Sequence, residues 1–250
     1  MLNDRLKLND DKTEFIIIGT RQQLAKVDID KLQVAGSVIS PSRDVKNLGC
    51  WLDTNMKFDT HIRKCCKAAF FHLYNIRRIR KFLSHDTVQI LVNAFVTSRL
   101  DYCNSLLYGL PANQLCKLQR VQNSAARLIC NVSRFDHITP TLFKLYWLPL
   151  KFRIDFKILF ITYKSIHGLA PEYLTELIKL KTSGRYHLRS CDKLLLDCPR
   201  IKTRVTLGDR SFAIATPTLW NSLPMEVRYA TSVTTFKKLL KTYLFSKAYM

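Results

Sequence analysis

The sequence predicts a mainly α-helical protein in which a helical bundle follows a small β element. Apolar residues recur at intervals of three and four in several segments after Asp59, which is the period of a helix. The clearest β-rich stretches lie before that residue. With 47% hydrophobic residues, and only seven Gly and eight Pro in 250 residues, the composition excludes a disordered or low-complexity chain.

The β element is predicted from two stretches, Lys12–Gly19 and Val45–Leu52, which polar and Pro-containing segments separate. Phe15–Ile18 is apolar at consecutive positions, so both faces of such a strand would be apolar. This pattern is typical of a strand buried inside a sheet. We therefore expect Phe15–Ile18 to be such a strand.

The first long helix is predicted from Asp59 onward. Its apolar face consists of Ile62, Cys65, Cys66, Ala69, Phe70, Leu73 and Ile76. A second stripe at helical spacing combines basic and aromatic residues and contains no acid: Arg63, Lys67, Phe71, Tyr74, Arg78 and Lys81.

Two further helices follow. The one from about Asp86 to Leu107 is apolar over most of its girth, which predicts that it forms the centre of the bundle. Gly109-Leu-Pro111 ends it, and the next helix begins near Asn113. That helix turns Leu115, Leu118, Gln122, Ala125, Leu128 and Ile129 inward and Lys117, Arg120, Ser124 and Arg127 outward.

The rest of the chain predicts a fourth helix, a basic connector and a closing helix. The fourth helix covers Phe152–Ile166, and Gly168 can end it in a left-handed conformation. The stretch Lys179–Arg210 holds nine basic and three acidic residues, with β-like pieces at Lys193–Leu196 and Ile201–Leu207. The closing helix begins at Ser232, with Lys237, Lys238 and Lys241 facing out. We expect three parts: 1–58, 59–178 and 179–250.

The charge favours a polyanionic partner. Forty basic and 19 acidic residues give +21, and residues 61–250 carry all of this excess. Such a field attracts nucleic acid first and an anionic membrane surface second. Long apolar runs and a signal peptide are missing from the sequence, and the eight cysteines are scattered in apolar stretches. We therefore expect an intracellular protein, in the cytoplasm or nucleus, with reduced thiols and no membrane span.

The residues predict no catalytic site and no metal site. Nucleotidyl transfer needs carboxylates that converge on two metal ions, and Asp10-Asp11 is the one adjacent acidic pair, in a turn-like polar stretch. His187, Cys191 and Cys198 could supply three zinc ligands, but their spacing is poor and a fourth ligand is missing. Ordinary loop residues are the favoured interpretation of that group.

Nucleic-acid binding is the best-supported function of the charged surface. The stripe from Arg63 to Lys81 interleaves cations that neutralise phosphates with aromatic rings that stack on bases. Lys117, Arg120 and Arg127 form a second candidate group. The alternative interpretation is that both groups are solvated helix faces.

Several stretches, taken in order, resemble one known family. They are Leu6–Phe15 (LKLNDDKTEF), Asn47–Asp53 (NLGCWLD) followed by His61-Ile62, Lys117–Arg127 (KLQRVQNSAAR), Gly168–Leu174 (GLAPEYL), Gly208–Phe212 (GDRSF) and Leu219–Pro224 (LWNSLP). Their ordered set resembles the C-terminal part of reverse transcriptases from non-LTR, LINE-type (jockey-like) retrotransposons. The resemblance extends over essentially all 250 residues.

The resemblance implies roles for particular segments. Leu6–Gly19 would be the end of the polymerase palm, with Lys12 a vestigial palm lysine. Leu48, Gly49, Cys50 and Trp51 would form the hairpin that grips the primer, and the helices from Asp59 would be the thumb-like region. The paired aspartates that hold Mg in the family would precede Met1, so we expect no catalytic residue and no cofactor in this chain.

The expected function is therefore sequence-independent binding of RNA or an RNA/DNA hybrid by a C-terminal piece of a retrotransposon polymerase. We expect the affinity to fall steeply with salt. Three alternatives stay open. The chain could be part of an active reverse transcriptase, either as a fragment of a longer protein or completed in trans by an N-terminal polymerase piece. It could be a basic interaction module or a peripheral membrane binder, or a translated relic without a function.

Overall fold

The computed structural model describes residues 9, 12–34, 37–181, 194–199 and 208–250. The chain divides into two compact units, residues 1–67 and 68–250. The division falls inside helix α2 (Asp59–Ile79), which runs from the first unit into the second. The protein is mainly helical and has two small antiparallel sheets, so the coarse fold prediction is confirmed. The expected three-part division and the thumb-like assignment stay predictions.

The first unit contains the expected small β element. Its elements before α2 are α1 (Arg21–Leu24) and two hairpins: β1 (Leu32–Val34) with β2 (Ser37–Ile39), and β3 (Asp44–Asn47) with β4 (Cys50–Asp53). Leu48 and Gly49 connect β3 to β4 with φ values of 46° and 88°. Two positive φ values are typical of the tight turn that matches the twist of a hairpin. The hairpin expected at Leu48–Trp51 is therefore present, and its role in gripping a primer stays a prediction.

The prediction of a buried strand at Phe15–Ile18 was wrong. The segment forms no strand, and only Phe15 makes a β-bridge, a parallel one to Pro41. Proline has no N–H to donate, so the ladder cannot continue through this partner. Ile18 is 49% exposed, and the other three residues are half-buried.

The Asp53 carboxylate accepts three backbone hydrogen bonds in the turn just before helix α2. Its Oδ1 accepts hydrogen bonds from the N–H groups of Asn55 and Lys57, and its Oδ2 accepts one from Phe58. These bonds shape the turn that leads into the helix. The predicted apolar face is largely confirmed, because four of its residues are buried, while Cys65 and Cys66 are half-buried and Phe70 is exposed; the buried residues are Ile62, Ala69, Leu73 and Ile76.

The helix predicted for Asp86–Leu107 is shorter and less regular than expected. It consists of α3 (His85–Val92), a π-helical turn (Asn93–Thr97) and α4 (Ser98–Asp101), before a separate 3₁₀ turn (Asn104–Leu107). Its buried residues, Val88, Val92, Val96 and Leu100, are four apart. A π-turn has more residues per turn than an α-helix, so it keeps a four-residue repeat on one face.

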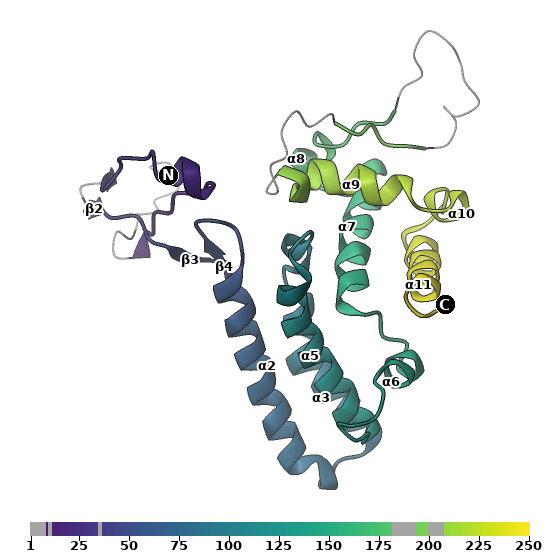
Figure 1. Ribbon diagram of the computed structural model, residues 1–250. Helices are drawn as coiled ribbons and strands as arrows, with labels where there is room; N and C mark the ends of the chain where they lie inside the picture. The colour runs from purple at the N-terminus through teal and green to yellow at the C-terminus, as the bar shows by residue number, and fades with distance from the viewer. Residues whose placement is uncertain (1–8, 10–11, 35–36, 182–193, 200–207) are drawn as a thin grey trace, which may run out of the picture. The chain divides into compact units, whose positions relative to one another are not determined.

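The same element is not the centre of the second unit, which corrects the other part of that prediction. Ile90 and Phe95 are 66% and 43% exposed, so one side of the element faces solvent. Helices α3 and α5 (Ala112–Cys130) lie side by side (Figure 1). The inward face predicted for α5 is largely confirmed, because Leu115 is half-buried and the other five residues are buried: Leu118, Gln122, Ala125, Leu128 and Ile129.

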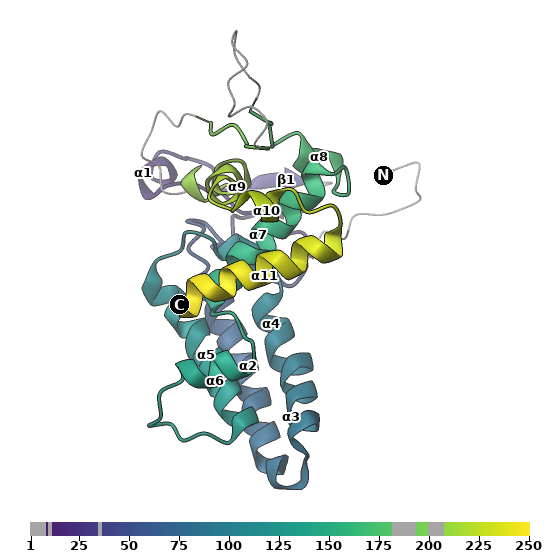
Figure 2. The ribbon, with the colours of Figure 1, turned by 90° about the vertical axis from the view of Figure 1, so that its right-hand side faces the viewer.

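The centre of the second unit is α7 (Leu150–Ile166), which packs against both α9 (Phe212–Asn221) and α11 (Val233–Tyr249). The helix ends as predicted: Gly168 has φ +65°, and the Leu169 N–H donates to the Lys164 carbonyl oxygen. Short helices α6 (Thr139–Lys144), α8 (Glu172–Thr175) and α10 (Met225–Arg228) fill the connections. Figure 2 shows α11 lying along the face that α7 and α10 present.

The main core joins these helices through large aromatic side chains. Trp220 and Phe236 are fully buried, and the rings of Tyr163 and Phe236 stack with centroids 4.2 Å apart. The Tyr163 hydroxyl donates to the Ala230 carbonyl oxygen at 2.9 Å. The closing helix is confirmed, with Ser232 as its N-cap and its three predicted lysines exposed.

Only part of the predicted basic connector is described. Leu196 forms an antiparallel bridge with Leu180, and its backbone exchanges hydrogen bonds with the Asn221 side-chain amide. The β-like piece Ile201–Leu207 and the residues 182–193 lie outside the described residues. Among the residues that the structure does describe, no helix is both long enough and apolar enough to cross a bilayer.

Asp155 is a buried carboxyl on α7, and it predicts a pH dependence of stability. Burial raises the pKa of Asp155 to about 6, although Lys151 and Lys247 oppose the shift. The folded state therefore holds this proton more tightly than the unfolded state, so stability falls as pH rises from about 4 to 6. We expect Asp155→Asn to be more stable than the parent at pH 8 by on the order of 2 to 3 kcal/mol.

The comparison of urea unfolding at about pH 8 and at about pH 3 checks this expectation. At the lower pH the carboxyl is protonated in the folded and in the unfolded state, so the advantage of Asp155→Asn should nearly vanish. An equal effect of the substitution at the two pH values would contradict a buried, ionised Asp155.

Candidate nucleic-acid interface

The predicted basic and aromatic stripe is exposed along α2 and, at Lys81, on the 3₁₀ turn Arg80–Phe82 that follows it. Arg63 and Lys67 are exposed on the part of α2 that belongs to the first unit. Phe71 and Tyr74, in the second unit, are 60% and 61% exposed. The four residues are followed by exposed Arg78 and Lys81, so each residue of the stripe is accessible to a ligand. Aromatic rings at these positions are not needed for the core, because Leu73 and Ile76 form the buried face.

A pocket of about 580 Å³ lies in the second unit, where the end of α2 meets the end of α5. Most of the residues around it are basic. We call it the basic pocket, and its lining residues are Arg77, Arg78, Arg80, Lys81, Arg127, Leu128, Asn131, Val132 and Arg134.

Two of the arginines build the walls of the basic pocket. The Arg80 guanidinium donates to the carbonyl oxygens of Leu128 and Ile129 at 3.3 and 3.4 Å, and so satisfies the C-terminal end of α5. Arg127 donates to the carbonyl oxygens of Ser133 and Asp136 at 2.9 to 3.1 Å. These bonds fix the loop after α5 and place two permanent positive charges behind the pocket.

The other four cations are open. Among the residues that the structure describes, no hydrogen bond or ion pair involves the side chains of Arg77, Arg78, Lys81 or Arg134, and all four are exposed. We call them the cation quartet. Asp136 is the acid in the loop beside them, and it accepts a hydrogen bond from the Ser133 N–H. One carboxylate against six cations leaves the pocket strongly positive.

Exposed aromatic rings accompany three members of the quartet. Arg78 lies over the Tyr74 ring at 5.9 Å, Lys81 over Phe82 at 4.8 Å, and Arg134 over Phe135 at 4.6 Å. Phe82 and Phe135 are 76% and 81% exposed. Rings of this exposure next to cations form a surface on which bases can stack while their phosphates meet positive charge.

The structure brings together only part of the predicted set. Arg78, Lys81 and Arg127 meet at the basic pocket. Lys117 and Arg120 do not line the basic pocket. They lie about 10 to 15 Å from Arg127 toward the start of α5, given the rise per residue of a helix. Both are exposed, and the Lys117 ammonium donates to the Gln114 side chain at 2.8 Å.

Sequence reasoning missed five residues of this surface: Arg77, Arg80, Phe82, Arg134 and Phe135. Four of the five residues in the run Arg77–Lys81 are basic, and this cluster is a signal for Arg77 and Arg80. The helical spacing of the predicted stripe includes only Arg78 and Lys81 from the run. Arg134 and Phe135 gave no such signal. They are placed by the loop that Arg127 fixes after the left-handed Asn131 at the end of α5.

Of the residues predicted to grip a primer, Leu48 and Gly49 form the β3–β4 turn of the first unit, and Cys50 and Trp51 begin β4. Leu48 is 86% exposed, and Cys50 is buried. The Lys64 ammonium lies 3.1 Å from the centroid of the Trp51 ring, and the backbone N–H of Trp51 donates to Nδ1 of His61. Burial lowers the pKa of His61, which favours the neutral ring that this bond requires.

The predicted catalytic and metal residues are described only in part. Lys12 is exposed, and its N–H donates to the Asn9 carbonyl oxygen. His187 and Cys191 lie outside the described residues, and Cys198 is exposed. Within the described ranges, no group of three His, Cys, Asp or Glu side chains is placed to hold a metal ion. The expectations about catalysis and zinc stay predictions.

Comparison of the chain with protein-family models, with curated proteins and with solved structures finds no match. The interpretation of the surface therefore depends on its own chemistry. A pocket lined by fixed arginines, with open cations and exposed rings at its rim, suits a chain of phosphates that carries planar groups.

Proposed function

We propose that this protein binds RNA, or the RNA strand of an RNA/DNA hybrid, without regard to sequence, through the basic pocket and the rings beside it. The observation that carries the proposal is the cation quartet, which surrounds one pocket and has no hydrogen-bond or ion-pair partner among the described residues. Open cations at this density repel each other, and a polyanion relieves that repulsion.

The chemistry of the pocket favours backbone contacts over base recognition. Arginine and lysine pair with phosphates, which carry no sequence information. Asn131 provides the one side-chain amide among the lining residues. Tyr74, Phe82 and Phe135 offer rings, and every base has a face that can stack on them. A single-stranded segment is the better ligand, because its bases are free to stack.

The resemblance to LINE-type reverse transcriptases gives this binding a context. In that context the helical unit would hold template or product for a polymerase whose carboxylates are supplied by other residues. The mainly helical second unit and the order of the family-like motifs support this proposal. We propose no nucleotidyl transfer by the chain itself.

Binding to two labelled single-stranded RNAs of unrelated sequence, compared with binding to anionic phospholipid vesicles, tests the proposal. We expect the two RNAs to bind with similar affinity, and both to bind more tightly than the vesicles at the same salt concentration. Tighter binding to the vesicles would assign the charge to a membrane surface instead. A large preference for one RNA sequence would contradict backbone recognition.

A further inference from the structure

A second pocket, of about 370 Å³, lies within the second unit. The π-helical turn, the loop after α6, and helices α7 and α11 contribute to it. Its volume is in the range of small-molecule sites. It shares no residue with the basic pocket, so substitutions can test the two pockets separately. We call it the α7–α11 pocket.

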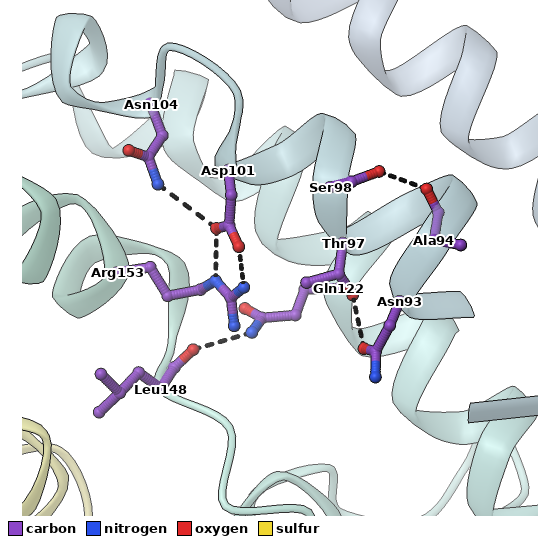
Figure 3. A network of polar contacts seen from close by, with 9 residues as sticks. All are labelled: Asn93, Ala94, Thr97, Ser98, Asp101, Asn104, Gln122, Leu148 and Arg153. Atoms are coloured by element: carbon purple, nitrogen blue, oxygen red, sulfur yellow. Dashed lines mark hydrogen bonds and ion pairs between the residues drawn. The ribbon is translucent and has the colours of Figure 1, made fainter. Parts of the chain in front are cut away.

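An ion pair fixes one wall of this pocket. Figure 3 shows the Arg153 guanidinium facing the Asp101 carboxylate: Nε donates to Oδ1 at 2.8 Å, and one terminal nitrogen donates to Oδ2. The Asn104 amide also donates to Asp101. The side chain of Arg153 is 17% exposed. Its two bonds to Asp101 hold the guanidinium in one orientation. Its other terminal nitrogen makes no bond to a described residue.

The π-helical turn supplies one amide donor, that of Asn93, to the same pocket. Its first and last residues, Asn93 and Thr97, both line the pocket. The Thr97 hydroxyl donates to Oδ1 of Asn93 at 3.3 Å (Figure 3), which leaves the amide nitrogen of Asn93 without a partner among the described residues. Single π-turns occur frequently at functional sites, since they redirect side chains at some cost in helix geometry.

An aromatic ring is held at the pocket by a strained backbone. Tyr146 lies just after α6 with φ +52°, where its N–H donates to Phe143 and the next N–H donates to Leu142. This helix-ending position favours Gly, because a side chain disfavours the left-handed conformation. The Tyr146 ring is nonetheless present, 67% exposed, and stacked on Phe245 at 5.7 Å. Trp147 lines the pocket beside it.

Two helices contribute positively charged side chains to the lining of the pocket. Lys157 of α7 and Lys241 of α11 line it, both are exposed, and no ion pair involves either among the described residues. With Arg153 and Asp101 they give a formal charge of +2 at the pocket. A ligand that satisfies this lining carries negative charge at one end and a planar ring with hydrogen-bond acceptors at the other.

We propose that the α7–α11 pocket binds a nucleoside monophosphate unit. The phosphate pairs with Lys157, Lys241 and the open side of Arg153. The base lies against the ring of Tyr146, and the Asn93 amide donates to the edge of the base. The unit is either a free nucleotide or an unpaired nucleotide of a bound RNA strand, because both present the same chemistry.

Calorimetric titration of the whole chain with AMP tests the site. We expect saturable binding with one site per chain, and weaker binding of both adenosine and inorganic phosphate, since each lacks half of the binding groups. Lys157→Gln/Lys241→Gln should weaken AMP binding by at least about tenfold. Lys164→Gln/Lys238→Gln, which changes one lysine on each of the same two helices outside the pocket, should not.

Tyr146→Gly separates a binding role of the ring from a structural one. Gly adopts the left-handed conformation freely, so the variant should keep the fold while AMP binds more weakly. AMP binding that survives both Tyr146→Gly and the Lys157/Lys241 double substitution would overturn the proposal. Inorganic phosphate that binds as tightly as AMP would overturn the assignment of a base.

The source of the nucleotide is distinguished with RNA that carries 5-iodouridine. A photochemical cross-link to Tyr146 or Trp147 supports an unpaired nucleotide of a strand, and saturable AMP binding without that cross-link supports a free nucleotide. Absence of both would refute the site. If only the cation-quartet substitutions abolish RNA affinity and AMP still binds, the α7–α11 pocket is a nucleotide site that does not depend on the proposed function.

Discussion

Replacement of the cation quartet by glutamine should reduce RNA affinity by about 10² to 10³ at about 0.1 M salt. Each phosphate that a cation neutralises on a single strand releases about 0.7 of a counterion, so removing four such cations accounts for a decrease of this size. The variant is Arg77→Gln/Arg78→Gln/Lys81→Gln/Arg134→Gln, and all four side chains are exposed without a hydrogen-bond or ion-pair partner among the described residues. Fluorescence anisotropy with labelled RNA measures the change.

The matched control removes the same charge elsewhere on the second unit. Lys144, Lys179, Lys181 and Lys238 are exposed and line neither pocket. Their replacement by glutamine changes the net charge equally, so it reports the effect of the general field alone. Equal decreases of affinity in the two variants would mean that RNA follows overall charge and not the basic pocket.

Trp220→Ala should destabilise the second unit by roughly 3 to 5 kcal/mol. Trp220 is 0% exposed, its centroid lies 6.0 Å from that of Phe236, and its Nε1 donates to the Leu194 carbonyl oxygen at 2.8 Å. The substitution leaves a cavity in the main core and removes the hydrogen-bond donor of the partly buried Leu194 carbonyl oxygen. A loss of this size is a large fraction of the stability of an ordinary domain.

Urea unfolding followed by circular dichroism measures this loss. Trp220→Phe keeps an aromatic ring but not the hydrogen bond, so its destabilisation should be intermediate, on the order of 1 to 3 kcal/mol. Tyr173→Ala, at a residue that is 67% exposed on α8, should change stability by less than about 0.5 kcal/mol. A Trp220→Ala variant as stable as Tyr173→Ala would contradict the core described above.

The helices of this protein could be predicted where one apolar face decides the structure. The spacing of three and four identifies the buried residues Ile62, Ala69 and Leu73 on α2. Residues at this spacing lie on one face of a helix, whatever element packs against that face. Local signals also sufficed for the Leu48-Gly49 turn and for the Gly168 helix end.

Elements that depend on distant residues could not be predicted in this way. Phe15–Ile18 has the composition of a strand, but a strand needs a partner, and the one partner residue among those described is Pro41. The helix that ends at Asp101 has an apolar continuation in the sequence. It ends where Asp101 pairs with Arg153, 52 residues further along the chain.

The type of the candidate interface could be predicted from the sequence, but the residues that form it could not. Charge and aromatic spacing predicted a candidate binding surface on α2 and just after it, and Arg78 and Lys81 of that prediction line the basic pocket. The spacing treats all outward cations alike, whereas the structure separates Arg80, which satisfies the end of α5, from its open neighbours. That distinction depends on which carbonyl groups lie within reach, and only the folded chain defines it.

The salt dependence of RNA affinity, measured for the parent and for the quartet variant, tests the central claim most directly. The account predicts that log K falls linearly with log salt for both proteins, and that the slope of the parent is steeper by about 3. Parallel lines for the two proteins would contradict it, because they would mean that none of the four side chains meets a phosphate.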